Sequence, residues 1–297
     1  MKNIKKTALA LIMACSLIAA PALSSAADAK LAESATETIE YKDGAKFTSN
    51  LYMKFQITSK KTAKVTGITA EYKKLSPYTD TVTGKKGYDL IIPNVVIYNN
   101  KQYKVDEIGN KAFKGDKKVI RVIHGKNLKK IGKEAFSGCS NMIFFLDNKV
   151  TELSKEAVSA MSKQLNAHPV FDSNVEVIGD RAFQNCTRMS SICLGSKIRK
   201  IGSKAFDNVG YSTLVITVEN KKIKASGIAK DFFKPSSKSK NILIYTNVNK
   251  TCYYYLTSKK TAGKQKASRT SGIWKCNSSR FPIIKSKSFI SYLTGKA

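Results

Sequence analysis

One six-residue unit, Ile-Gly-x-x-Ala-Phe, recurs along the middle of the sequence. The four clear copies begin at Ile108, Ile131, Ile178 and Ile201. Their spacings are 23, 47 and 23 residues, and because 47 is about twice 23, we expect a degenerate copy in the gap, at residues 153–158. A weaker sixth copy is expected at Ile223. Units this short cannot bury an apolar side alone, so the repeat predicts at least three stacked coils.

Each residue type in the unit has a structural task. Ile and Phe can both point inward, Ala lets neighbouring coils approach, and Gly allows a backbone bend that a Cβ would resist. Four of the five residues that lie eight positions after the Ile are apolar, and two of them are Cys139 and Cys186. We therefore expect buried, unreactive thiols there. The predicted repeat core is Ile108, Phe113, Ile131, Phe136, Cys139, Ile178, Phe183, Cys186, Ile201 and Phe206.

Strands are predicted between the units, at residues 119–124, 142–147 and 189–194. They occupy positions 11 to 16 after each starting Ile, and positions 11, 14 and 16 are assigned to the interior. Positions 13 and 15 point outward and form a candidate partner-binding face of the sheet. These outward residues are Arg121, Ile123, Phe144, Leu146, Ser191 and Cys193. The alternative is that the cap or a second copy of the chain shields this face.

The ends of the array differ from its middle. Residues 30–40 are polar and expected to be disordered, and residues 41–107 are expected to form a β-rich cap that protects the first sheet edge and includes a β-hairpin over residues 95–105. The repeats are assigned to residues 108–255. Residues 256–297 are predicted to be a Lys-rich, partly disordered tail, with residues 258–272 mobile.

The first 29 residues have the pattern of a secretory signal peptide. Lys2, Lys5 and Lys6 precede an uncharged, apolar stretch that ends in small residues. Cleavage after Ala26 or after Ala29 fits equally, and lipidation at Cys15 is a minor alternative. We therefore predict a secreted or cell-surface protein whose mature chain has no transmembrane segment.

The net charge and the small numbers of His and Cys limit the possible functions. The chain has 52 Lys and Arg against 21 Asp and Glu, a formal net charge of +31, which favours anionic partners. His124 and His168 lack a second ligand at helical spacing, and the five cysteines beyond the leader form no Cys-x-x-Cys pair. No nucleophile elbow or phosphate loop is present, and Glu134 and Asp180 are expected to be solvated surface residues. We predict no enzyme, cofactor or metal site, and scattered lysines disfavour nucleic acid.

The unit Ile-Gly-x-x-Ala-Phe-x-x-Cys, followed by a strand and a short loop, resembles the BspA-like leucine-rich repeats of bacterial surface proteins. The resemblance covers roughly residues 88–255. It implies a leucine-rich-repeat solenoid, a β-rich α/β fold whose curved, right-handed coils carry a parallel sheet on one face and short helical turns on the other. It also implies a place outside the cell and a role in adhesion or protein binding. Residues 153–158 depart from the pattern because they lack both Gly and Phe.

Two hypotheses for function follow. The first is a protein-binding or adhesion solenoid that contacts host or bacterial surface proteins through the outward strand face. The second is retention by charge, with lysines binding anionic cell-wall polymers or glycans.

Overall fold

The computed structural model describes residues 38–40, 46–48, 53–69, 78–79, 84–98, 101–147, 167–169, 174–270, 273–276, 283–284 and 287–297. The predicted leader at residues 1–29 and the degenerate copy at residues 153–158 lie outside these ranges. β1 (Thr38–Glu40) pairs with β2 (Lys46–Thr48), so the last three residues of the segment expected to be disordered form a strand.

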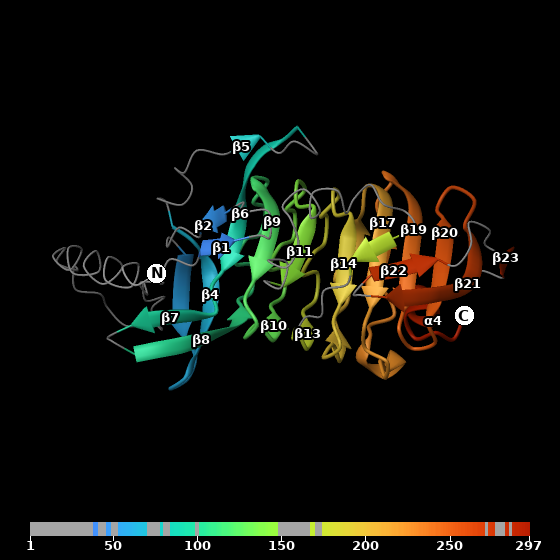
Figure 1. Cartoon of the computed structure of the whole chain (residues 1–297). Coiled ribbons are helices and arrows are strands. Elements are labelled where there is room, and N and C mark those ends of the chain that lie inside the picture. Colours follow the sequence, from blue (N-terminus) through green and yellow to red (C-terminus); the bar gives the residue numbers. More distant parts are fainter. Residues whose placement is uncertain are drawn as a thin grey trace, which may run out of the picture.

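Six longer strands follow one another in chain order along the stack (Figure 1). They pair in parallel within two groups of three, and a hydrogen bond from the Ser190 N–H to the Ile143 carbonyl oxygen (3.1 Å) joins the groups. The predicted parallel sheet is therefore present. The strands are β6 (Lys86–Ile92), β9 (Val119–His124), β11 (Phe144–Asp147), β14 (Ser191–Leu194), β17 (Ser212–Val218) and β19 (Ser239–Thr246).

A second sheet is built where each coil begins. Four of its strands end on the first Ile of the unit, so that Ile108, Ile131, Ile178 and Ile201 lie side by side in register. The strands are β8 (Lys101–Ile108), β10 (Lys130–Ile131), β13 (Val177–Ile178) and β15 (Lys200–Ile201). The two sheets and the Ala-Phe segments enclose one continuous apolar core.

The N-terminal cap extends the second sheet. β3 (Met53–Ile57) and β4 (Thr62–Ile68) are antiparallel, and β4 pairs in parallel with β8. β7 (Val95–Tyr98) and β8 form the expected hairpin, while β5 (Tyr78–Thr79) pairs with β6. The cap thus completes the hydrogen bonds of the first coil, as a solenoid requires.

The Ala-Phe segments are chains of turns, and the prediction of helical turns there is wrong. The third residue after each Ile has a left-handed backbone, with φ of 57° at Lys111 and 55° at Glu134, which interrupts a right-handed helix. Alternate N–H groups bond to the next coil: Phe113 donates to the Ala135 oxygen at 2.8 Å. The described residues contain only two short helical segments, η3 (Ala225–Gly227) and α4 (Phe289–Leu293).

The residues of the predicted repeat core lie inside the stack. All ten predicted residues are buried, with exposed fractions of 4% or less. Phe113, Phe136, Phe183 and Phe206 form a stack whose ring centroids lie 5.1, 5.4 and 5.1 Å apart. The Cys139 thiol donates to the Phe113 carbonyl oxygen at 3.1 Å.

The order of coils differs from the prediction in the middle of the array. The coil of Ile131 pairs directly with that of Ile178, and the Phe136 N–H donates to the Ala182 oxygen at 2.8 Å. Because these two coils pair directly, the prediction that an additional coil lies between them is wrong. The extra residues between them include β12 (Ala167–Pro169), which pairs with β22 (Ile273–Cys276) near the C-terminus.

The last coil begins at Ile228 and not at Ile223. Ile201 bridges to Ile228, and β16 (Phe206–Val209) pairs with β18 (Phe233–Pro235). The unit is disguised because its Gly position is Ala229 and its Ala position is Phe232.

The C-terminal region is structured where it is described, so the predicted mobile tail is wrong there. β20 (Thr251–Leu256), β21 (Thr261–Thr270) and β22 continue the sheet as antiparallel strands, and β23 (Ile283–Ile284) pairs with β21. In α4, Tyr292 and Leu293 are buried, and the Phe289 ring contacts Phe233 at 4.4 Å. This helix closes the apolar core at the C-terminal end.

Candidate binding surfaces

The outward face of the long strands does not provide the contact surface that was predicted. Arg121, Ile123 and Ser191 are 3%, 0% and 5% exposed, and only Cys193 is half-buried. These three buried residues cannot form an open contact surface, so the prediction is wrong for them. Phe144 and Leu146 lie in β11, but their side chains are outside the described part of the structure.

Arg121 shows how this face accommodates a charge. Its Nε donates to Oδ1 of Asp89 at 3.0 Å, and both side chains are 4% exposed. A buried cation is tolerated only when it is paired and hydrogen-bonded. The pair joins β6 to β9 and is part of the structural framework.

Farther along, the same face forms a second core. Val215, Leu243, Tyr245, Cys252 and Ala267 pack together and are all buried. Strands buried on both faces have continuous apolar runs and little alternation. Residues 242–245 carry that signal in full, and residues 119–123 and 214–218 carry it except at Arg121 and Thr217.

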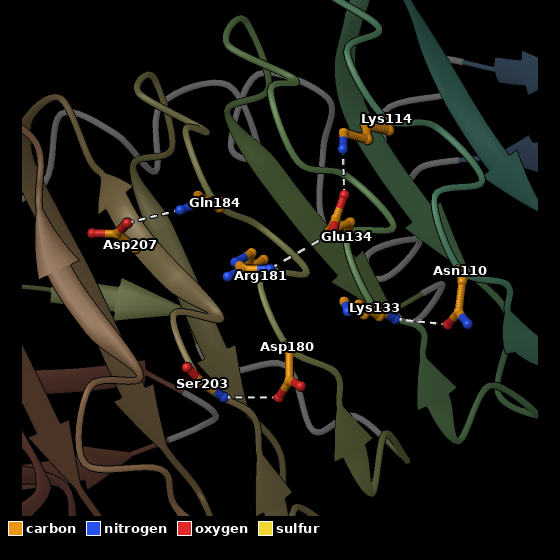
Figure 2. A network of polar contacts seen from close by, with 9 residues as sticks. All are labelled: Asn110, Lys114, Lys133, Glu134, Asp180, Arg181, Gln184, Ser203 and Asp207. Atoms are coloured by element: carbon orange, nitrogen blue, oxygen red, sulfur yellow. Dashed lines mark hydrogen bonds and ion pairs between the residues drawn. The ribbon is translucent and has the colours of Figure 1, made fainter.

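The turn side of the array bears a polar network that crosses the coils (Figure 2). The Lys133 N–H donates to Asn110 Oδ1, and 70 residues later the Ser203 N–H donates to Asp180 Oδ1, both at 2.9 Å. These contacts recur because the residue after the Gly stands in the same place in each coil. A side-chain oxygen there binds the next coil, so Asp180 has a structural partner in addition to solvent.

Glu134 joins two neighbouring coils. Its carboxylate accepts a hydrogen bond from Lys114 and lies 4.0 Å from the Arg181 guanidinium. The residue is only 8% exposed, so the expectation of a solvated side chain is wrong. The bond from Lys114 lowers the pKa of Glu134, against a smaller opposing effect of burial.

A row of basic side chains lies where the loops after the strands lead into the next coil. We call this row the basic edge, and it consists of Lys126, Lys129, Lys130, Lys197, Arg199, Lys200, Lys221, Lys222 and Lys224. All nine are exposed. Parallel pairing aligns Lys130 with Val177 and Val177 with Lys200, and the Asn220 side chain donates to the Ile198 oxygen at 2.7 Å. The loops of successive coils are thus stacked along one edge.

Few carboxylates neutralise the basic edge. Lys130 pairs with Glu107 at 3.1 Å and Arg199 with Glu176 at 3.2 Å. The other seven cations have no ion pair among the described residues. The sequence signal for this edge is the basic pair directly before the unit, Lys129-Lys130 and again Arg199-Lys200, which differs from a scattered surface charge because it recurs at the same place in the unit.

His124 and the buried thiols Cys139 and Cys186 occupy structural positions. His124 is 1% exposed, and its ring lies 4.7 Å from that of Phe145. Burial raises the pKa values of Cys139 and Cys186 well above the ordinary thiol range, which disfavours the reactive thiolate. The described residues contain no group of three or more His, Cys, Asp or Glu side chains able to hold a metal ion. They also contain no helix with the length and hydropathy needed to cross a membrane.

Comparison with known proteins agrees with the repeat geometry. The family model of the BspA type leucine rich repeat region matches in six copies over residues 94–169 and 166–262, more than half of the chain. The chain belongs to the BspA-type leucine-rich repeat family. No curated protein sequence matches this BspA-type protein.

Solved structures similar to this BspA-type protein include three bacterial leucine-rich repeat proteins. One from Bacteroides ovatus shares 22% identity over 67% of this chain and 42% of that chain, with a TM-score of 0.40. The T. pallidum leucine-rich repeat protein shares 19% over 60% and 62%, with a TM-score of 0.39. A leucine-rich cell surface protein from Faecalibacterium prausnitzii shares 13% over 71% and 58%, with a TM-score of 0.37. The BspA-type chain thus spans less than two thirds of each.

Proposed function

We propose that this BspA-type protein is a non-catalytic binding protein, secreted or held at the bacterial surface, that adheres to anionic wall polymers or glycans through its basic edge. The observation that carries the proposal is the row of seven exposed cations that have no ion pair with any described residue. Exposed cations on three of the stacked loops, at residues 126–130, 197–200 and 221–224, suit a partner that carries many negative charges, because several contacts form together. The right-handed, curved form of the stack stays a prediction.

Family membership supports a binding role, and the name of the Faecalibacterium prausnitzii relative places that protein at the cell surface. Burial of the outward strand face favours charge over an apolar strip as the means of contact. Phe144 and Leu146 stay predicted contacts for a host or bacterial surface protein. Substituting both with Ser should abolish capture of such a partner and leave thermal unfolding unchanged.

The test compares two variants with the same change in net charge. The edge variant carries Lys126→Gln, Lys129→Gln, Lys197→Gln and Lys200→Gln, and the control carries Lys60→Gln, Lys61→Gln, Lys238→Gln and Lys240→Gln. All eight lysines are exposed. Each protein is sedimented with purified anionic cell wall at rising salt concentration.

We expect the edge variant to bind the wall more weakly than the control. Exposed ion pairs contribute about 0.2–1 kcal/mol each, so the loss of four should lower affinity by about fourfold to about 900-fold at low salt. The wild-type protein should be released as salt rises, because screening shortens the range of exposed charges to about 8 Å at physiological ionic strength. Equal binding by the two variants, or wild-type retention that ignores salt, contradicts the proposal.

A further inference from the structure

The cap and the first coil border an open hollow of about 540 Å³, which we call the cap pocket. Its wall combines Lys54 of β3, residues 66–68 of β4, Tyr88 of β6 and residues 112–118 of the first turn segment. Pockets that enclose small ligands commonly measure about 300–1,000 Å³. The hollow is therefore large enough for a ligand with a ring.

The cap pocket is strongly cationic. Lys54, Lys114, Lys117 and Lys118 line it together with one carboxylate, that of Asp116. The Lys114 ammonium is already bound by a glutamate of the next coil. The other three ammonium groups have no ion pair within the described part of the chain, so three positive charges are available to a ligand.

Asp116 supplies the one negative charge of the lining and offsets part of this positive charge, and both of its oxygens accept hydrogen bonds from the pocket wall. One accepts a hydrogen bond from the Tyr88 hydroxyl, and the other accepts one from the Lys118 N–H at 3.0 Å. The carboxylate is therefore fixed against the wall. It also orients the start of the segment that carries Lys117 and Lys118.

The pocket also offers an unused hydroxyl and an apolar wall. Thr66 Oγ1 is shielded from solvent and has no hydrogen-bond partner among the described residues. A ligand oxygen placed against this hydroxyl would supply its missing hydrogen-bond partner. Ile68 and Ala112, both half-buried, supply the apolar part of the lining.

The pocket is preformed. The Gly109 N–H donates to the Val65 oxygen at 2.7 Å, which holds β4 against the first coil. A Cβ built on Gly67 would lie 3.1 Å from the Ala112 oxygen, so the cap and the coil approach closely at the pocket wall. A rigid site loses little conformational entropy on binding.

We propose that the cap pocket binds an acidic sugar unit, a ring that bears a carboxylate or sulfate, within an anionic glycan. The unpaired ammonium groups would bind the acidic group, Thr66 a ring hydroxyl, and the apolar wall the C–H face of the ring. This inference rests on the proposed anionic partner and adds a defined recognition site to it. A hollow that combines cations, a hydroxyl and an apolar wall suits a polar ring better than an extended acidic peptide.

The test measures binding of a sulfated heparin tetrasaccharide by calorimetry at low salt, with the desulfated form as ligand control. The pocket variant carries Lys54→Gln, Lys117→Gln and Lys118→Gln. The matched variant carries Lys238→Gln, Lys240→Gln and Lys259→Gln, exposed lysines of the C-terminal region. Neither set includes the basic edge, so the result is independent of the edge experiment.

We expect at least a tenfold loss of affinity in the pocket variant and less than a twofold change in the matched variant. Thr66→Val should weaken binding severalfold without lowering the melting temperature, because it removes only an unpartnered hydroxyl; it decides the matter if the triple variant does not fold. Equal losses in both triple variants, or no binding by the wild type, overturn the proposal. Hexaglutamate binding as tightly, with the same loss in the pocket variant, overturns the assignment to a sugar.

Discussion

The stacked phenylalanines offer a measure of how strongly neighbouring coils hold together. Phe183 contacts three rings, those of Phe136 at 5.4 Å, Phe206 at 5.1 Å and Phe145 at 5.2 Å. Phe113 has one ring contact among the described residues, with Phe136 at 5.1 Å. The two residues stand at the same position of their units and are equally buried, each 2% exposed.

Replacing each of these two residues with Leu therefore separates ring contact from burial. An aromatic pair contributes about 0.5–1.5 kcal/mol beyond its buried area. Phe183→Leu should lower the free energy of unfolding by about 1.5–4.5 kcal/mol, and Phe113→Leu by about 0.5–1.5 kcal/mol. These values are the ring-contact part of each loss. Both substitutions also lose the buried area that separates Phe from Leu, and this second part cancels when the two variants are compared.

Urea unfolding, followed by circular dichroism, gives the two free energies. Ile178→Val and Ile108→Val in the same coils measure how much position in the array matters by itself, because these residues share one register and are buried. If the two Leu variants lose equal stability after that correction, ring stacking adds nothing beyond burial and the reasoning is refuted.

Three further predictions concern charges and backbone. Arg121→Ala should cost about 3–5 kcal/mol because it leaves Asp89 buried without its cation, whereas Arg121→Met combined with Asp89→Leu should recover most of that loss in urea unfolding; an additive double variant would contradict this. Lys204→Gly should stabilise the protein by up to about 1 kcal/mol, since its φ is 52°, and Lys200→Gly in an extended strand should destabilise it by a similar amount. Glu134→Gln should destabilise the protein at pH 7. Because the pKa of Glu134 is lowered below 4.5, its contribution is present above that pH and is lost as the pH falls through the lowered pKa, so wild-type and variant melting temperatures should converge in acid and not in base.

The repeat alone predicted the architecture because its recurring residues are those buried in the core. Ile131, Phe136 and Cys139 could be assigned inward from spacing, since every coil imposes the same environment on them. The unit at Ile228 escaped because its Ala position holds Phe232, which changes the pattern without changing the backbone pairing.

Features that depend on distant segments could not be read from the repeat. β21 contains Lys264 and Lys266 and lacks large apolar residues, yet its backbone pairs with β20 and β22, so hydrogen bonds determine the strand. The cap pocket needs Lys54 and Lys117, which are 63 residues apart, to lie on one wall. Only the stacking of the cap on the first coil brings them together.

The pairing of β12 with β22 has a consequence for how the array comes apart. Coils of a repeat protein interact chiefly with their neighbours, so such arrays ordinarily fray from their ends. Here β12, which belongs to the segment that connects the coils of Ile131 and Ile178, pairs with β22 near the C-terminus. The C-terminal coils lie between these two attachment points, and they cannot detach one at a time unless that pairing opens first. The half of the molecule beyond Ile178 should accordingly unfold as one cooperative block.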